Sequence, residues 1–588
     1  MSATESNNIG AHNESALPLV IAVTGHRDLV PAEVPAIREK VEALFQFLAE
    51  RYADRRLSVM SSLAEGADQL AAEAALARGI ELTVPLPMPM DLYLQDFDTP
   101  EARARFESLC GQASEIYELP LAKGNTLEKI ARPGGARNRE YAQVGVFLCA
   151  HCHILLALWD GKPGTEVGGT GQVVKFHHDD IMPGYTQKTV ATQQMLVDDE
   201  SDLVYHIVCS RNRPDGEPHE NFRPLQCFWF TKDRHTPRSQ EIPKQHQVIF
   251  ERSGEFSRSA MEFAEQIRSE SYSLLTAEAE SLLPPGIGDI NRIFCMADWL
   301  AIHFQKKTLM VLRITHILAF LMGLMFILYS DYQTWPYYMF AFLLFFLIAA
   351  ITQHIAKRNG WSRRYLDYRA LAEGLRVQFY WAAAGVTNEN ESKFTHDNFL
   401  QTQDPELGWI RNVMRVAGTR CDAAPSMTPA GLEFAMRDWI GDDNTGQLGY
   451  YRKKVRERMR KNRSTERLGT ISLLTSVVVV VLFVVAGSSI PGNLRDPLMV
   501  VMGTMLLLFG VRQGYAFSTA EKELIKQYEF MLRIFHNARR RLENAGDVTE
   551  QRQVLLALGG SALDEHAEWI LMHRDRSPDQ SELWRMGN

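Results

Sequence analysis

The stretch Leu155-Leu-Ala-Leu-Trp159-Asp160-Gly161 closes an apolar run with an acid and a glycine, and the glycine-rich loop Gly168-Gly-Thr-Gly171 follows it. An apolar run of this length is typical of a strand buried in a parallel sheet. Glycine lets the backbone approach a ligand closely, so that successive N–H groups can point at an anion. The stretch therefore predicts a strand that leads into a phosphate-binding turn, although a loop of this kind is more often only a turn.

Bulk composition narrows the class of protein. The chain has 588 residues, which is too long for one core and predicts two to four domains. A formal net charge of −8 argues against a general nucleic-acid binder. Seven scattered cysteines form no disulfide framework and suit a reducing compartment. Residues 1–17 lack the basic start and apolar core of a signal peptide and predict a disordered tail.

Strands and helices alternate along residues 18–240. Short runs predict strands at 19–23, 57–60, 80–85, 114–118 and 154–159, and a late strand pair at 203–209 and 225–231. Helical spacing fills the segments between the first five runs. This alternation predicts an α/β fold with a Rossmann-like, doubly wound parallel sheet, in which ligands lie beyond the carboxyl ends of the strands.

Three predicted strand ends carry polar or glycine residues and together predict a nucleotide site. Backbone amides and Arg27 can hold phosphate, and the serines and acids can bond ribose hydroxyls or a base edge. The alternatives are structural, with His26 as a helix cap and Asp68 as a solvated acid in a first helical turn. The candidate ligand-binding residues at these ends are Thr24, Gly25, His26, Arg27, Ser61, Ser62, Glu65, Gly66, Asp68, Asp160, Gly161, Gly168, Gly169, Thr170 and Gly171.

The segment Cys149-Ala-His-Cys-His153 is dense in residue types that bind metals. No second Cys-x-x-Cys or His pair accompanies it, so a buried helix end that enters a strand explains it better. The polar stretch His177-His-Asp-Asp180 is as compatible with a solvated loop as with a site. We therefore expect no metal and no cofactor.

The second half of the chain contains four long apolar runs. They cover residues 309–329, 337–355, 468–486 and 497–517, and each is long enough to cross a hydrocarbon core of about 30 Å. Arg313 and Arg512 lie near the ends of their runs, where arginine can extend to the membrane surface. Four such runs in two pairs predict a helical membrane region with four transmembrane helices in two hairpins.

Charge asymmetry predicts the orientation of these hairpins. The loops within the pairs are short and contain acids, whereas the opposite ends are basic, with eight Lys or Arg residues between Arg452 and Arg463. The positive-inside rule then predicts a multi-pass inner-membrane protein with both termini in the cytoplasm. Near an anionic leaflet, each basic residue can contribute about 1 kcal/mol.

The two hairpins are offset by about 160 residues, and each precedes an amphipathic helix, in which Tyr368 and Tyr528 share the offset. The pattern predicts an internal repeat. The predicted segments are a tail at 1–17, a nucleotide-binding domain at 18–240 and a helical connector at 241–306. They continue with a hairpin plus helix at 307–386, a cytosolic insert at 387–465, a second hairpin plus helix at 466–545 and a helical tail at 546–588.

Three motifs together carry a resemblance to a family. Thr24-Gly-His-Arg27, Ser62-Leu-Ala-Glu-Gly-Ala-Asp68 and the stretch from Trp159 to Gly171 resemble the SLOG superfamily of Rossmann-like domains, over about residues 18–240. This superfamily includes Lonely-Guy phosphoribohydrolases, DprA-like proteins and the amino-terminal domain of TRPM channels. The resemblance implies a nucleotide site, and it adds Arg137 and Arg139 as candidates for the family's arginine.

One departure bears on activity. Enzymatic members of the superfamily carry a catalytic Glu after Gly-Gly-x-Gly-Thr, but here Gly169-Thr170 is followed by Gly171, Gln172 and Val173. The missing acid favours a binding module over a hydrolase. The hairpins followed by Tyr- and Arg-bearing helices resemble SLATT effector domains, which accompany SLOG sensors in bacterial conflict systems.

The resemblance implies a membrane effector that senses a nucleotide, a cyclic (oligo)nucleotide or an ADP-ribose-type second messenger. We expect a homo-oligomer in contact with membrane lipids, without nucleic acid, that forms a pore or disrupts the membrane in antiviral defence. The alternative is a membrane-anchored nucleotide-processing enzyme of the phosphoribohydrolase or deoxyribosyltransferase type, with Glu65, Asp160 or Glu166 as the acid. A passive scaffold is a further alternative.

Overall fold

The computed structural model describes residues 17–186, 202–232, 238–331, 336–386, 399–400, 405–425, 427–487 and 489–575. The predicted tail therefore lies outside the described residues except for Leu17, as do parts of the predicted insert and of the carboxyl-terminal tail. The chain divides into two units. One comprises Met1–Ala297 with Leu371–Glu433, and the other comprises Asp298–Ala370 with Phe434–Asn588.

The first unit contains a seven-stranded sheet in the order β4-β3-β2-β1-β5-β6-β7. Six strands are parallel and β7 is antiparallel to β6. This confirms the predicted Rossmann-like parallel sheet and its late strand pair. The strands are β1 (Leu19–Gly25), β2 (Leu57–Met60), β3 (Glu81–Leu86), β4 (Glu115–Glu118), β5 (Ile154–Trp159), β6 (Leu203–Val208) and β7 (Cys227–Phe230).

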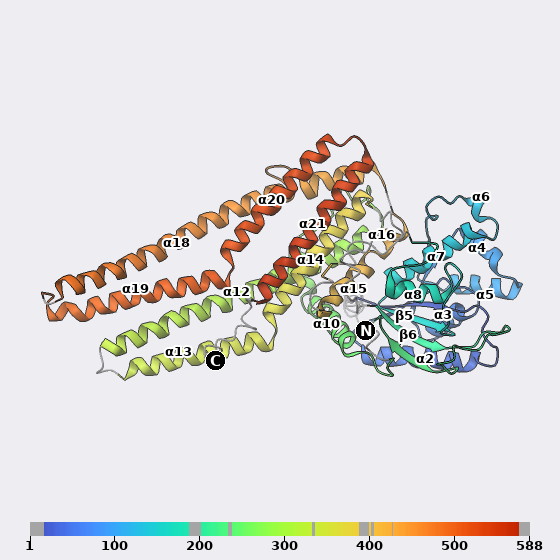
Figure 1. Cartoon of the computed structure of the whole chain (residues 1–588), viewed down its shortest axis with the longest axis horizontal. Helices are drawn as coiled ribbons and strands as arrows, with labels where there is room; N and C mark the ends of the chain where they lie inside the picture. The colour runs from blue at the N-terminus through green and yellow to red at the C-terminus, as the bar shows by residue number, and fades with distance from the viewer. Residues whose placement is uncertain are drawn as a thin grey trace, which may run out of the picture. The chain divides into compact units, whose positions relative to one another are not determined.

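Helices cover both faces of this sheet, with α8 on one side of β5 and α2 on the other (Figure 1). All six residues of β5 are buried, as expected for a strand that is covered twice. Its side chains alternate, so that Leu155, Ala157 and Trp159 pack in one core with Val173 and Phe176 of α8. The helices around the sheet are α2 (Val34–Arg51), α3 (Ala67–Ala77), α4 (Met90–Tyr93), α5 (Pro100–Cys110), α6 (Leu127–Ile130), α7 (Gly135–Ala150) and α8 (Thr170–Asp179).

Residues from two distant segments complete the first unit. Helix α15 packs against α10, and the backbone carbonyls of Asn412 and Arg415 contact the rings of His153 and His151 at 3.1 and 2.7 Å. Residues 241–297 and 371–433 thus belong with the sheet, which differs from the predicted boundaries at 240 and 387. The helices are α10 (Lys244–Glu262), α11 (Ala264–Glu270), α15 (Gly408–Ala417), α16 (Thr419–Ala423) and α17 (Pro429–Phe434).

The predicted helical connector at 241–306 is not helical throughout, because residues 271–286 form bends and turns. The side chain of Asn291 provides a physical reason. Its Oδ1 accepts the backbone N–H groups of Leu274 and Leu275 at 2.9 and 3.2 Å. These amide N–H groups are therefore hydrogen-bonded without a helix, and helix formation would gain no hydrogen bond for them.

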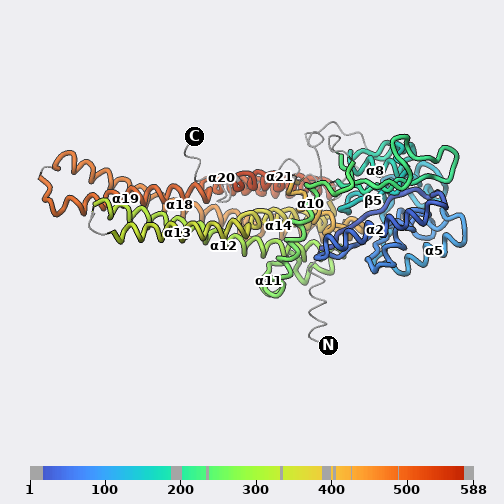
Figure 2. Tube along the Cα trace, turned by 90° about the horizontal axis from the view of Figure 1, so that it is seen from below, coloured from blue at the N-terminus to red at the C-terminus, as the bar shows by residue number. Residues whose placement is uncertain are grey.

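The second unit contains helices that are long and apolar enough to cross a membrane. There are four such segments among the described residues, judged by length and composition, and they contain the four predicted apolar runs. α12 pairs with α13 and α18 with α19 (Figures 1 and 2), while their origin as a repeat stays a prediction. The helices are α12 (Ile287–Asp331), α13 (Tyr337–Arg358), α14 (Trp361–Ala384), α18 (Gly446–Ala486), α19 (Gly492–Ser518), α20 (Glu521–Asn544) and α21 (Val548–Asp575), of which α12 and α14 contribute to both units.

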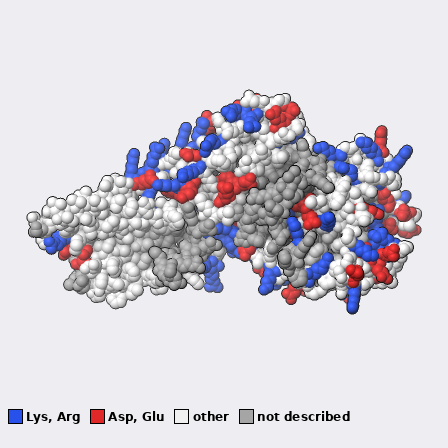
Figure 3. Space-filling model, in the orientation of Figure 1, with Lys and Arg blue, Asp and Glu red and all other residues white. Residues whose placement is uncertain are grey.

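The apolar segments expose their side chains. Val484 and Val485 are each 79% exposed, and no residue of α13 is buried. On the face shown in Figure 3, this part of the unit is nearly free of charge except at its tip, and Lys and Arg side chains gather beyond it. Exposure of an apolar surface of this size is unfavourable in water, whereas contact with the hydrocarbon of a membrane is favourable.

Candidate functional site

A cleft of about 410 Å³ lies at the carboxyl ends of β1 and β5. From β1 the chain adds β2, β3 and β4 on one side, and it then returns to add β5, β6 and β7 on the other side. Ligands of doubly wound sheets bind at the point between β1 and β5, where the direction of the strand order changes. Most of the predicted ligand-binding residues line this cleft, which brings together the three strand ends. They are Thr24, Gly25, His26, Arg27, Ser62, Asp68, Asp160, Gly168, Gly169, Thr170 and Gly171.

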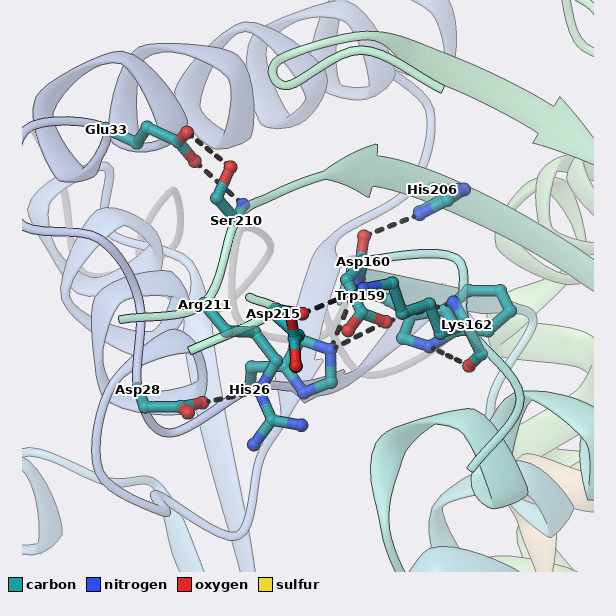
Figure 4. A network of polar contacts seen from close by, with 10 residues as sticks. All are labelled: His26, Asp28, Glu33, Trp159, Asp160, Lys162, His206, Ser210, Arg211 and Asp215. Atoms are coloured by element: carbon teal, nitrogen blue, oxygen red, sulfur yellow. Dashed lines mark hydrogen bonds and ion pairs between the residues drawn. The ribbon is translucent and has the colours of Figure 1, made fainter. Parts of the chain in front are cut away.

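His26 and Asp160 line the cleft and contact each other (Figure 4). Each follows its strand directly, and the backbone amide of His26 bonds the Leu158 carbonyl at 3.1 Å. The Nε2 atom of His26 lies 3.2 Å from both the amide nitrogen and Oδ1 of Asp160. It accepts from the amide when it carries no proton and donates to the carboxylate when it does.

Asp160 is only 2% exposed, yet it is held ionised. Burial opposes its charge, but hydrogen bonds from His26 and from the Lys162 amide lower the pKa of this carboxyl below its usual value. The amide of Lys162 donates to Oδ1 of Asp160 at 3.0 Å. The turn after β5 is therefore organised around a fixed negative charge.

Asp68 is a second buried acid in the cleft, in the first turn of α3, and is 6% exposed. Burial raises the pKa of its carboxyl to about 7, against the opposing effects of Arg27 and of hydrogen bonds from the backbone amides of Ala64 and Gly25. The structural alternative of a solvated first-turn acid is thus excluded, because Asp68 is buried. The cleft holds one carboxyl that stays ionised and one that changes charge near neutral pH.

Basic side chains surround these acids. The guanidinium carbon of Arg27 lies 5.1 Å from the centre of the Tyr141 ring, and the ammonium of Lys162 bonds the Asp215 carbonyl at 2.8 Å. Arg211 pairs with Asp28 at 2.8 Å. In the described part of the chain, exposed Arg213 has no ion pair, so its charge is available to an anion at the mouth of the cleft.

Several residues that line the cleft were not among the predicted binding residues. They are Asp28, Tyr93, Asn138, Tyr141, Lys162, Thr165, Glu166, Arg211 and Arg213, of which only Glu166 was considered, as a catalytic acid. Arg211 and Arg213 follow β6, which is parallel to β5. Because β6 is parallel to β5 as well as antiparallel to β7, its carboxyl end lies at the same sheet edge as that of β5, and the rule that places ligands at this edge applies to Arg211 and Arg213.

Six predicted residues do not line the cleft: Ser61, Glu65, Gly66, Arg137, Arg139 and Gly161. Arg137 is 3% exposed, and its guanidinium bonds Asp96 and the carbonyls of Leu92 and Ile130. Arg139 stacks over Tyr185 at 5.5 Å. These arginines bond or stack on neighbouring protein groups and do not line the cleft, unlike most of the other candidates.

Two glycines are needed because chain segments approach closely. Gly66 has φ +85°, and a Cβ there would lie 2.3 Å from the Arg27 carbonyl oxygen. A Cβ at Gly171 would lie 2.6 Å from the Gly164 amide nitrogen. Gly66 thus shapes the turn that carries Arg27 without lining the cleft itself. Gly169, at the start of α8, has more room, with its nearest neighbour at 3.2 Å.

The segment from Cys149 to His153 is the predicted buried helix end, between α7 and β5. The His153 ring accepts the Val20 amide on Nδ1 at 2.9 Å, and burial lowers the pKa of this imidazole to about 3. Its ring is therefore neutral and used in packing. Among the described residues, no group of three or more His, Cys, Asp or Glu side chains could hold a metal ion.

Comparison of this chain with known protein families, with curated proteins and with solved structures gave no match.

Proposed function

We propose that the chain is a membrane-associated sensor whose cleft binds a nucleotide or a nucleotide-derived second messenger. The observation that carries this proposal is the cleft at the carboxyl ends of β1 and β5, lined by Arg27, Lys162, Arg213 and the first turn of α8. Cations and a helix amino terminus stabilise phosphate, and the buried acids offer acceptors to sugar hydroxyls or a base.

The motifs behind the SLOG resemblance meet at this one cleft, which supports the proposed class of ligand. Val173, at the position of the catalytic Glu in enzymatic members, is apolar and 3% exposed. We therefore favour recognition over turnover. The proposed response follows the SLATT resemblance: ligand binding changes the packing or oligomeric state of the membrane helices, and the inner membrane is permeabilised in antiviral defence. A ligand drives such a change only through its differential affinity for the two states.

A specific observation also favours a second function, a nucleotide-processing enzyme. The cleft contains two carboxyls whose pKa values are shifted in opposite directions, with Asp160 lowered and Asp68 raised to about 7. Such a pair is the usual arrangement for one ionised and one protonated catalytic carboxyl at neutral pH. Asp68 then takes the role of acid that the sequence suggested for Glu65.

One experiment separates the two functions and the scaffold alternative. The full chain, purified in detergent, is incubated with a panel of nucleotides and cyclic dinucleotides, and both binding and products are followed. Binding without products supports the sensor, whereas product formation that is lost in Asp68→Asn supports the enzyme. A chain that binds none of these ligands and is not toxic on overexpression is a scaffold.

Gly169 provides the matched pair of variants for this test. Gly169→Glu places a carboxylate at the start of α8 in the cleft, whereas Gly169→Ala adds only a methyl group that has limited room. We expect Gly169→Glu to abolish ligand response while the protein stays folded and inserted, and Gly169→Ala to retain it. A normal response from Gly169→Glu would remove this loop from the site.

A further inference from the structure

A second cavity, of about 150 Å³, lies within the second unit between α12, α14, α18, α19, α20 and α21, of which α21 contributes His573. It is separate from the cleft at the sheet. Both apolar and polar side chains line it. Leu309 and Leu312 of α12 lie on its wall with Leu366 of α14, and hydroxyl groups come from Thr308 and Ser362.

The lining residues lie at the ends of the apolar stretches. Helix α12 reaches the cavity between Gln305 and Arg313, where its apolar run begins, and α19 reaches it at Tyr515 and Ser518, where its run ends. Helix α18 contributes Arg458 and Lys461, which precede its run at Leu468. All these ends are on the basic side, where the phospholipid headgroups of the cytoplasmic leaflet are expected.

Positive charge exceeds negative charge at this cavity. Lys461 lies 3.5 Å from Glu521, the only carboxylate in the described lining. Arg313 and Arg458 have no carboxylate partner in the described part of the chain. The guanidinium of Arg458 instead lies over the ring of Tyr528 at 5.3 Å. Two arginines are therefore left with their charge uncompensated.

A neutral donor completes the set. The Gln305 side-chain amide donates to the hydroxyl oxygen of Tyr365 at 2.9 Å, so the Tyr365 proton remains available for an acceptor in the cavity. Guanidinium groups and hydroxyls together recognise phosphate oxygens. The cavity is too small for a whole lipid, but it is large enough for a phosphate group with part of its glycerol.

We propose that this cavity binds the phosphate of an anionic phospholipid from the cytoplasmic leaflet. Arg313 approaches from within the apolar stretch and Arg458 from the aqueous side, and basic pockets between membrane helices are a known way to select anionic headgroups. A zwitterionic headgroup brings its own cation, which these arginines repel. Because six helices line the cavity, the bound phosphate links both hairpins and stabilises their arrangement.

Native mass spectrometry of the full chain in detergent tests this proposal. The protein is titrated with phosphatidylglycerol and with phosphatidylcholine, and bound lipids are counted. We expect one phosphatidylglycerol to bind with a preference of about tenfold or more, and this preference to disappear in Arg313→Gln/Arg458→Gln, which removes two charge-assisted contacts. The readout involves no nucleotide, so it stands or fails separately from the sensor function.

The matched control is Arg456→Gln/Arg463→Gln. It removes the same charge, but these exposed arginines line outer grooves of α18 and not this cavity. If both double variants lost the preference for phosphatidylglycerol equally, the preference would come from general attraction to a basic surface and not from this cavity. Displacement of the lipid by inorganic phosphate would reassign the cavity to a soluble anion, and either result overturns the proposal.

Tyr365→Phe keeps the test decisive if the double arginine variant does not fold. It removes one hydroxyl donor and leaves every charge in place, so we expect about a fivefold loss of affinity for phosphatidylglycerol. An unchanged affinity in Tyr365→Phe, together with an unfolded arginine variant, would count against the cavity as the binding site.

Discussion

Asp68 illustrates how a single side chain acquires its chemistry from its position. Its place in the first turn of α3 is ordinary for an acid, but the turn lies under Arg27 at the end of β1 and is buried. Burial raises the pKa of its carboxyl to about 7, from 3.8. The ionised form is therefore disfavoured in the folded protein, and protonation at this site is linked to stability.

The sign of this linkage gives the first prediction. Asp68 contributes to stability fully below about pH 4, and the contribution is lost as the pH rises toward 7, by on the order of 4 kcal/mol at most. Asp68→Asn cannot ionise, so we expect its melting temperature to change less between pH 4.5 and 7.5 and to exceed that of the wild type at pH 8. Thermal unfolding of the full chain in detergent measures both.

Glu166→Gln is the control for this prediction, because Glu166 is exposed at the same cleft. We expect its pH profile to follow the wild type. Binding of a phosphate-bearing ligand should also weaken as the pH rises through 7 in the wild type and in Glu166→Gln, but not in Asp68→Asn. The same pH slope in all three proteins would show that another group is responsible.

At the scale of elements, Gly66 and Gly79 distinguish two reasons for a glycine: a left-handed backbone, and close contact with another chain segment. Both Gly66 and Gly79 have positive φ, at +85° and +70°, but a Cβ at Gly79 has nothing within 4 Å. We expect Gly79→Ala to cost about 1 kcal/mol, for the left-handed backbone alone. We expect Gly66→Ala to cost at least about 2 kcal/mol more, because the Arg27 carbonyl must move.

Chemical denaturation of the two variants compares these costs. Gly66→Ala should also weaken anion binding, since the displaced turn carries Arg27, whereas Gly79→Ala should leave binding unchanged. Similar destabilisation by the two substitutions would mean that the segment after β1, which holds the Arg27 carbonyl, moves aside easily. If Gly66→Ala bound anions as well as the wild type, Arg27 would not be part of the binding site.

The elements that were predictable are those with a strong local signal. Apolar runs and their alternation with helices predicted the strands, and their carboxyl ends predicted the position of most of the cleft, including Thr24, Asp160 and Gly169. Arg137 does not line the cleft, and its sequence position could not indicate this, because an arginine at a helix start looks the same whether it faces a ligand or bonds Asp96. Arg211 was missed because the direction of β6 depends on its partner, which a short strand alone does not reveal.

The whole molecule depends on contacts between segments that are distant in sequence. Within the first unit, Arg415 pairs with Asp202 at 2.9 Å, and both side chains are almost completely buried. Arg55 donates to the Phe250 carbonyl at 3.0 Å. No local sequence pattern indicates these distant partners, and residues 405–425 were therefore predicted as part of a separate insert.

These contacts predict that residues 1–240 alone do not form a stable domain. Without α10 and α15, Asp202, Arg55 and two histidines lose buried partners, and each unsatisfied group costs about 1–3 kcal/mol. We expect this fragment to aggregate or to melt well below the full chain. A chain of 1–297 joined by a flexible linker to 371–433 should fold, and equal melting temperatures of the two fragments would contradict the assignment.

The direction of membrane insertion is the last prediction, and α18 is the element that constrains it. This 41-residue helix is about 60 Å long, twice the hydrocarbon thickness, so its basic half extends beyond the membrane. Because basic segments are retained in the cytoplasm, we expect Asn493→Cys, in the first turn of α19, to react with an impermeant maleimide in intact cells. Glu457→Cys should react only after permeabilisation. The native cysteines provide the baseline, since all seven lie in segments predicted to be cytoplasmic, and the reverse labelling pattern would invert the topology.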